Sequence, residues 1–378
     1  MITGLGHQAT RTFRAGAFTF LVKTTHADDR DLVQSLFSDL PAPELDLPAD
    51  GLFVLTRHDK RSHPVRWTLV GPRVPEEQPS DLATVLTRLL GAVNLCALDS
   101  DPEGLHLHAA AAVRDGRTVV IAAQRNTGKT TTIAHLCRRG WSFVTDETVR
   151  LSADGHTVSG FAKPLSIKPN GHLHVEHLQP LLVPHDGDPA ESFRFAAIGS
   201  SGVSIAAEGR PHTVILLRRD LEDLHRGPSA DALHTSDAVV ALMQETLDAE
   251  RFGAAALCLA RFAANSRCFV VTLGSPDETA DNIAELASLE PMKSAPVSAL
   301  PPSDAIQSSV RSVLVDGRAV VHEQGSGRIF ALDEPATRIW LHLGGWQRDA
   351  AINFNGPGLA PFVRQLEALG VLTAGAVG

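Results

Sequence analysis

The sequence VVIAAQRNTGKTTT, at positions 119–132, decides the fold of this chain. Its apolar beginning predicts a short buried strand, its middle predicts a turn, and the threonines after Lys129 predict the first turn of a helix. Gly-Lys-Thr at 128–130 is how a phosphate-binding loop ends. In such a loop backbone N–H groups and a helix N-terminus face the anion, the lysine reaches the outer phosphates and the hydroxyl binds Mg²⁺. The expected nucleotide-binding residues are Asn126, Thr127, Gly128, Lys129, Thr130 and Thr131.

One position departs from the usual pattern of a glycine, four residues and Gly-Lys-Ser/Thr, because Ala123 stands where the first glycine is expected. A lone Gly-Lys-Thr also occurs in ordinary strand–helix turns. The apolar strand, the loop and the helix follow one another in register, and this favours a true phosphate site.

The composition is that of a globular protein with two or three domains. The chain has 378 residues, of which 43% are hydrophobic and 20% charged. Its net charge of −9, with mixed signs and no tyrosine, argues against a nucleic-acid partner. No run of eighteen apolar residues and no secretion signal are visible, so we expect a cytoplasmic protein without a membrane partner. Four widely spaced cysteines fit reduced thiols in that compartment.

Changes in composition and hydrophobic pattern along the chain predict four segments. Residues 1–100 predict an N-terminal α+β domain, and 101–290 an α/β nucleotide-binding domain with much antiparallel character. Residues 291–308 are rich in proline and serine and predict a linker. Residues 309–378 predict a compact final unit of short strands and two helices.

Asp146 and Glu147 follow the next predicted strand after the loop. In an α/β sheet that strand end faces the same crevice as the phosphate loop. Two adjacent carboxylates there can take separate catalytic roles. We expect Glu147, with Thr130, to hold the metal and Asp146 to act on the acceptor hydroxyl. A helix-capping or solvated acidic pair is the alternative.

Two further candidates for catalysis are His108 and Lys168. His106 and His108 lie before the loop's own strand and by alternation share a face, so one of them can touch the phosphate or the acidic pair. A structural histidine is an equal alternative. Lys168 closes an apolar strand, where a second cation would neutralise charge at the phosphates. Arg210, Arg218 and Arg219 are weaker candidates, for which surface salt bridges are the better explanation.

Several motifs together resemble the HPr kinase/phosphorylase family, in particular its relatives beside peptide-modifying gene clusters. They are LHAAA at 107–111, RDGR at 114–117, GKTT at 128–131, RGW at 139–141, TDE at 145–147 and PLSIK at 164–168. The resemblance covers about residues 100 to 280. It implies a core of the HPr kinase/phosphoenolpyruvate carboxykinase type that phosphorylates a serine hydroxyl with ATP and Mg²⁺. By position, Asp146 matches the family's acid/base aspartate, Glu147 its second, metal-binding aspartate, and His108 its histidine before the loop, while Asn126 replaces an internal glycine.

The final unit resembles a PqqD-like peptide chaperone, a winged-helix module that recognises leader segments of ribosomal precursor peptides. The matching stretches are GRIFALD at 327–333, ATRIW at 336–340 and LEALGVL at 366–372. An exposed strand edge there offers an extended peptide a place to pair, and the expected contacts are Arg328, Ile329 and Phe330. Core packing is the better explanation for Trp340.

The sequence therefore predicts an ATP- and Mg²⁺-dependent kinase whose final unit binds the leader of its precursor peptide. Other enzymes of the same biosynthetic cluster are possible partners. Two rivals stay open. The first is a degenerate kinase that only binds and presents a peptide. The second uses ATP to activate a carboxylate instead of phosphorylating a hydroxyl.

Overall fold

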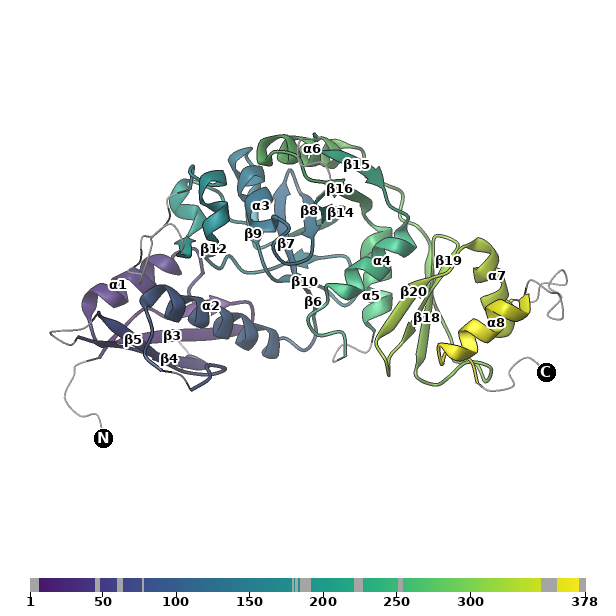
Figure 1. Cartoon of the computed structure of the whole chain (residues 1–378), viewed down its shortest axis with the longest axis horizontal. Helices are drawn as coiled ribbons and strands as arrows, with labels where there is room; N and C mark the ends of the chain where they lie inside the picture. The colour runs from purple at the N-terminus through teal and green to yellow at the C-terminus, as the bar shows by residue number, and fades with distance from the viewer. Residues whose placement is uncertain are drawn as a thin grey trace.

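The computed structural model describes residues 7–44, 48–59, 64–76, 78–178, 180, 183, 192–220, 227–250, 254–347 and 359–373. They form a mixed α/β structure with several sheets, arranged in a row from the N-terminal to the C-terminal unit (Figure 1). The central part holds the expected strand, loop and helix. It therefore positions the candidate site, and the outer units are described by what they add to it.

The N-terminal unit is a five-stranded sheet with two helices packed on one face. Strand order is β1-β3-β4-β5 with β2 paired to β3, and β3 and β4 run parallel. Alternate side chains of these strands are buried, as the sequence pattern predicts. The elements are β1 (Gln8–Ala9), β2 (Phe13–Ala15), β3 (Phe18–Thr24), α1 (Ala27–Leu36), β4 (Gly51–His58), β5 (Arg66–Val70) and α2 (Leu82–Asp99).

Asp81 is the N-cap of helix α2, because its carboxylate accepts the backbone N–H of Thr84 at 2.9 Å. Within the part of the chain that the structure describes, α2 is the one helix long and apolar enough to cross a membrane. About two thirds of it, 67%, is buried inside the fold, which is also how a core helix behaves, so this is weak evidence for a span.

The central sheet joins nine strands in the order β6-β10-β11-β14-β8-β7-β9, with β16 beside β14 and β15 beside β16. Strands β8, β14 and β16 run parallel. Strand β9 shares their direction, because β7 is antiparallel to both β8 and β9. The carboxyl ends of these four strands therefore meet at one edge of the sheet. The strands are β6 (Leu105–Leu107), β7 (Ala109–Arg114), β8 (Arg117–Ala122), β9 (Ser142–Thr145), β10 (Val149–Leu151), β11 (Val158–Ser159), β14 (Glu208–Arg218), β15 (Ser229–Ala232) and β16 (Arg267–Thr272).

Helices cover both faces of this sheet. On one face α3 and α6 bury a core that includes Ile121, Phe143 and Ile215, and on the other α4 and α5 bury one that includes Val120 and Val214. The helices are α3 (Lys129–Arg138), α4 (Thr235–Gln244), α5 (Ala255–Ala264) and α6 (Pro276–Ser288). A two-stranded sheet of β12 (Leu165–Ile167) and β13 (Arg194–Ala196) lies nearby, with short 3-10 helices at Pro169–His174 and Ile198–Ser201.

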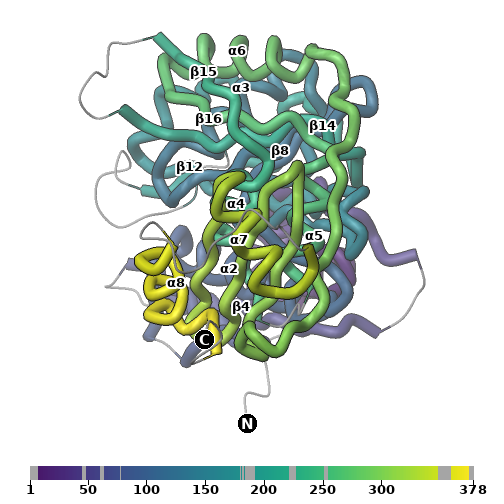
Figure 2. The backbone as a smooth tube through the Cα atoms, turned by 90° about the vertical axis from the view of Figure 1, so that its right-hand side faces the viewer, coloured from purple at the N-terminus to yellow at the C-terminus, as the bar shows by residue number. Residues whose placement is uncertain are grey.

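The C-terminal unit is a four-stranded sheet of order β17-β18-β19-β20, followed by two helices. Figure 2 looks from this side, with α7 and α8 towards the viewer. One face of the sheet carries α7 and α8, and the other packs on α4 and α5, where Val313, Val315 and Val320 join the core of the central unit. The elements are β17 (Val297–Leu300), β18 (Val310–Val315), β19 (Arg318–Glu323), β20 (Arg328–Ala331), α7 (Glu334–Leu343) and α8 (Leu359–Ala368).

The stretch 291–308, which the composition predicts to be a linker, contains the edge strand β17. Its residues pair antiparallel with β18, from Val297 opposite Val315 to Leu300 opposite Ser312. The prolines that suggest a linker lie on either side of this strand, where a missing N–H does not disturb the ladder. The C-terminal unit is therefore joined to the central unit by packing as well as by chain.

Because that core is shared, we expect the two units to unfold together. Val320→Asp places a carboxylate in a site with 0% exposure and should cost about 3–5 kcal/mol. Calorimetry should then show the main unfolding transition moving down in temperature as one event. Val70→Asp, at a position 67% exposed, is the matched control and should change stability by less than about 0.5 kcal/mol. A main transition left in place by Val320→Asp would contradict the shared core.

Candidate functional site

The phosphate loop connects the end of β8 to the start of α3. Asn126 has φ of 69° and Gly128 has φ of 129°, so two positions of the loop need a left-handed backbone. Asparagine is one of the few residues besides glycine that adopt it readily. Ala123 is only 6% exposed in the core beneath the loop, and its φ is not positive. The two departures from the glycine pattern are therefore compatible with the loop's shape.

Lys129 is the buried cation of the loop. Lys129 is only 7% exposed, and its ammonium donates a hydrogen bond to the Ala123 carbonyl at 2.6 Å. Burial lowers its pKa, while the charges of Glu245, Asp146 and Glu147 act in the opposite direction. Among the described residues no carboxylate forms an ion pair with it. A cation held this way at a helix N-terminus suits an anionic ligand.

The acidic pair meets the loop at the same edge of the sheet, as the strand directions require. The Thr130 hydroxyl donates to Asp146 Oδ2 at 3.4 Å across the start of α3. Burial is the main cause that raises the pKa of Asp146. The structure thus brings Thr130 and Asp146 together, and the local chain places Glu147 beside them.

Lys163 is the third member of this cluster. It is 3% exposed, and its ammonium lies 3.4 Å from Asp146 Oδ1 and 2.6 Å from Glu147 Oε2. Its charge is the main cause that lowers the pKa of Glu147. The sequence pattern draws attention to Lys168, five residues further on, and gives no sign of Lys163, because the segment before β12 has no regular periodicity.

The cluster fits a magnesium ion bound together with nucleotide phosphates. Mg²⁺ takes one or two protein oxygens and completes its shell with phosphate and water. Thr130 and Asp146 offer such oxygens, because Asp146 Oδ2 faces the Thr130 hydroxyl while Oδ1 lies 3.4 Å from the Lys163 ammonium. Among the residues described, no group of three or more histidine, cysteine or carboxylate side chains could hold a metal ion, so the donors present suit an ion shared with a ligand better than a protein-only metal site.

His108 and His106 are separated by a bend instead of sharing a strand face. Strand β6 ends at Leu107, and His108 lies between β6 and β7, where its N–H donates to the Glu245 carbonyl at 2.7 Å. His106 is held by Asp248 at 2.7 Å and Asp101 at 3.3 Å. The sequence expectation of one shared face is wrong for this reason, and only His108 turns towards the loop.

The surroundings of His108 favour its neutral form. Burial and the nearby positive charges of Lys129 and Arg125 lower its pKa to about 4, although Glu147 acts in the opposite direction. Glu245, the C-cap residue of α4, lies near this site and, like Lys163, is not singled out by the sequence. Burial raises the pKa of its carboxyl, against the opposing charge of Lys129.

Two exposed cations flank the loop. Lys168 donates to the Asn126 side-chain oxygen, which places it beside the loop as the sequence expectation requires. Arg219, after the end of β14, donates to the Thr127 carbonyl at 3.3 Å. Arg218 instead bonds Thr272 at 3.3 Å. Lys168 and Arg219 are therefore two further cations that contact the loop.

The predicted peptide contacts lie elsewhere. Arg328, Ile329 and Phe330 form β20, at one end of the C-terminal sheet. Ile329 packs towards α4 and α5, and Phe330 towards α7 and α8. Trp340 has 0% exposure and belongs to that second core, in agreement with a packing role.

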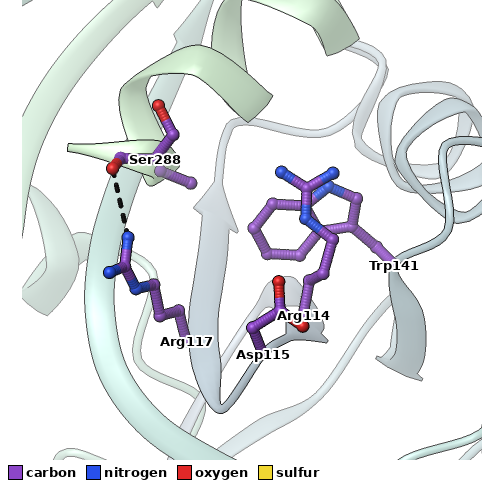
Figure 3. Close-up of a pocket in the computed structure, with 6 residues that line it drawn as sticks. Arg114, Asp115, Arg117, Trp141 and Ser288 are labelled. Atoms are coloured by element: carbon purple, nitrogen blue, oxygen red, sulfur yellow. Dashed lines mark hydrogen bonds between the residues drawn. The ribbon is translucent and has the colours of Figure 1, made fainter.

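A pocket of about 290 Å³ opens at the opposite edge of the sheet (Figure 3). The Arg114 guanidinium lies 4.5 Å from the centre of the Trp141 ring, and Arg117 donates to the Ser288 carbonyl at 3.1 Å. Because it is built on the β7–β8 turn, it lies at the far ends of these strands from the phosphate loop. Its lining residues are Arg114, Asp115, Arg117, Trp141, Ala287 and Ser288.

Comparisons with known proteins find similarity among solved structures. No protein-family model and no curated protein matches the chain. Among solved structures it is similar to the Hpr(Ser) kinase/phosphatase from Coxiella burnetii, at 14% identity, over 48% of this chain and 96% of that chain, with a TM-score of 0.25. A score this low does not establish a common fold. The function proposed below therefore depends on the geometry of the site.

The pKa of His108 leads to a prediction about pH. Folding lowers that pKa from about 6.5 to about 4, so the unfolded chain holds the proton more tightly. The stability due to neutral His108 is therefore complete above about pH 6.5 and is lost as the pH falls towards 4. Replacing His108 by glutamine should remove roughly 1–2 kcal/mol of the stability loss between pH 7 and pH 5, measured by urea unfolding. Identical pH profiles for the two proteins would show that His108 is not held neutral.

Proposed function

We propose that this chain is an ATP- and Mg²⁺-dependent kinase that phosphorylates a hydroxyl, expected to be a serine, of a ribosomally made precursor peptide. The observation that carries this proposal is the contact of Thr130 with Asp146 beside buried Lys129. Phosphate cradle, metal-binding hydroxyl and carboxylate meet there in one place. Such a grouping is what phosphoryl transfer requires.

The residues divide into donor and acceptor roles. Backbone N–H groups from 126–131 and Lys129 bind the phosphates, with Lys168 beside the loop as a further cation. Mg·ATP would supply the phosphoryl group, and the Thr130 hydroxyl would help to hold its metal ion. Asp146 accepts the proton of the acceptor hydroxyl, and burial brings its pKa closer to neutral, as a general base needs. The neutral His108 ring lies near Glu147 and hydrogen-bonds with the backbone of that residue.

The leader segment is proposed to add to β20 as a further strand. The Leu332 N–H donates to Ala319 of β19 at 2.8 Å, so by the alternation of the ladder the N–H groups of Ile329 and Ala331 face outward. These outward groups can pair with an extended peptide. In this proposal the kinase acts in the cytoplasm, and other enzymes of the same biosynthetic cluster are possible partners.

Asp146→Asn tests the catalytic assignment. The amide cannot accept the proton, so incorporation of phosphate into the cognate peptide, followed by mass spectrometry, should fall about 10²–10⁴-fold. Calorimetric binding of ATP should persist, because Lys129 and the loop backbone are left in place. Asp154→Asn, in an exposed turn, is the matched control and should retain activity.

Equal product from Asp146→Asn would remove that residue from the mechanism. If wild-type protein binds the leader but no nucleotide, the chain is instead a degenerate kinase that presents a peptide. AMP in place of ADP as product would indicate carboxylate activation.

Ala331→Pro tests the peptide edge. Proline removes an N–H that faces away from β19, so the sheet should persist while one bond to the added strand is lost. We expect leader affinity, measured by fluorescence anisotropy, to fall about tenfold. Ala331→Ser keeps the N–H and should bind as the wild type does. Unchanged affinity of the proline variant would place the leader elsewhere.

A further inference from the structure

Lys163 occupies a distinctive position in the acidic cluster. Its ammonium contacts one oxygen of each neighbouring carboxylate, Oδ1 of Asp146 and Oε2 of Glu147. The second oxygen of Asp146 is turned to Thr130. An ammonium thus lies between the two carboxylates, and the side of Asp146 that faces the phosphate loop stays available.

The chain holds Lys163 there from two sides. Gly160 approaches the acidic segment so closely that a Cβ would come within 2.8 Å of Thr145 and 3.2 Å of the Thr148 carbonyl. Phe161, 8% exposed, packs in the core of the N-terminal unit, and its carbonyl accepts the Lys163 N–H at 2.8 Å. The backbone before and at Lys163 is therefore fixed, and the side chain has one direction to take.

The charges explain why the ammonium stays. Burial by itself lowers the pKa of Lys163, but the charges of Asp146 and Glu147 outweigh it and raise the pKa above its ordinary value. Removing one partner of a buried cluster of this kind leaves an uncompensated charge. The two carboxylates therefore need a cation between them at all times, whether or not a ligand is bound.

We propose that Lys163 is a built-in cation that takes the bridging position between Asp146 and Glu147, so that the site accepts one divalent ion and not two. Two-metal sites place ions about 3.5–4 Å apart around shared carboxylates, and here the ammonium fills one such place. The single ion is bound on the Thr130 side of Asp146. Glu147 then acts as the partner of Lys163, in contrast to the metal-binding role expected from the sequence. This inference rests on the proposed function only in that it assumes a bound nucleotide.

The experiment counts Mn²⁺ ions by electron paramagnetic resonance, with and without ADP. Lys163→Met vacates the bridging position between two carboxylates and should bind one more Mn²⁺ per chain than the wild type. Lys163→Gln keeps an amide donor for Glu147 and should show the same gain. It replaces the methionine variant in the test if that variant folds poorly. Lys163→Arg keeps the charge, and Lys23→Met changes an exposed lysine of β3, so both should match the wild type.

The outcomes separate the two proposals. A folded Lys163→Met or Lys163→Gln protein with no additional ion overturns the role of Lys163, and so does a wild-type count of two ions with ADP. A wild type that binds no Mn²⁺ with ADP overturns the nucleotide site. In that case the one-ion gain of the variants without ADP still supports Lys163 as the bridging cation.

Discussion

Several charged groups are buried at one edge of the central sheet, and the rest of the structure has to stabilise them there. Lys129, Asp146 and Lys163 are each less than a tenth exposed, and Glu147 completes the set. Such groups are tolerated only when each has a partner of the opposite sign or a ligand. Asp146 and Glu147 share Lys163, and Lys129 is left facing the loop. This arrangement is the basis for the proposal that the edge binds an anion together with a metal ion.

The N-terminal unit contributes to this arrangement from behind. Phe161, which precedes Lys163, is buried among its side chains. The Thr148 hydroxyl, two residues from Asp146, donates to Asn94 of α2 at 2.8 Å. The backbone N–H of Gly199 donates to Asp39 at 2.9 Å. These contacts show how the N-terminal unit fixes the segment that carries the acidic pair.

Helix α4 links the site to the C-terminal unit. At its start, His234 lies 3.7 Å from Asp316 and Asp237 lies 3.8 Å from Arg318, both in the β18–β19 turn region. At its end, the Glu245 carbonyl accepts the His108 N–H. One helix thus touches both the sheet proposed to bind a leader and the residue that precedes β7, the strand paired with β8 of the phosphate loop. This arrangement places the two proposed activities on a single packed framework, without a flexible tether.

The sequence by itself determined the local parts: the strand, loop and helix around Lys129, and the acidic pair at a strand end. These follow from periodicity and from residues with special backbone preferences, which act over a few neighbours. Only the tertiary structure decided that Lys163 reaches Asp146 and Glu147, and that His106 and His108 do not share a strand face. It also decided that β17 belongs to a sheet packed on α4 and α5. The physical reason is that these outcomes depend on segments far apart in the chain, where a long side chain or an apolar face meets its partner only after folding.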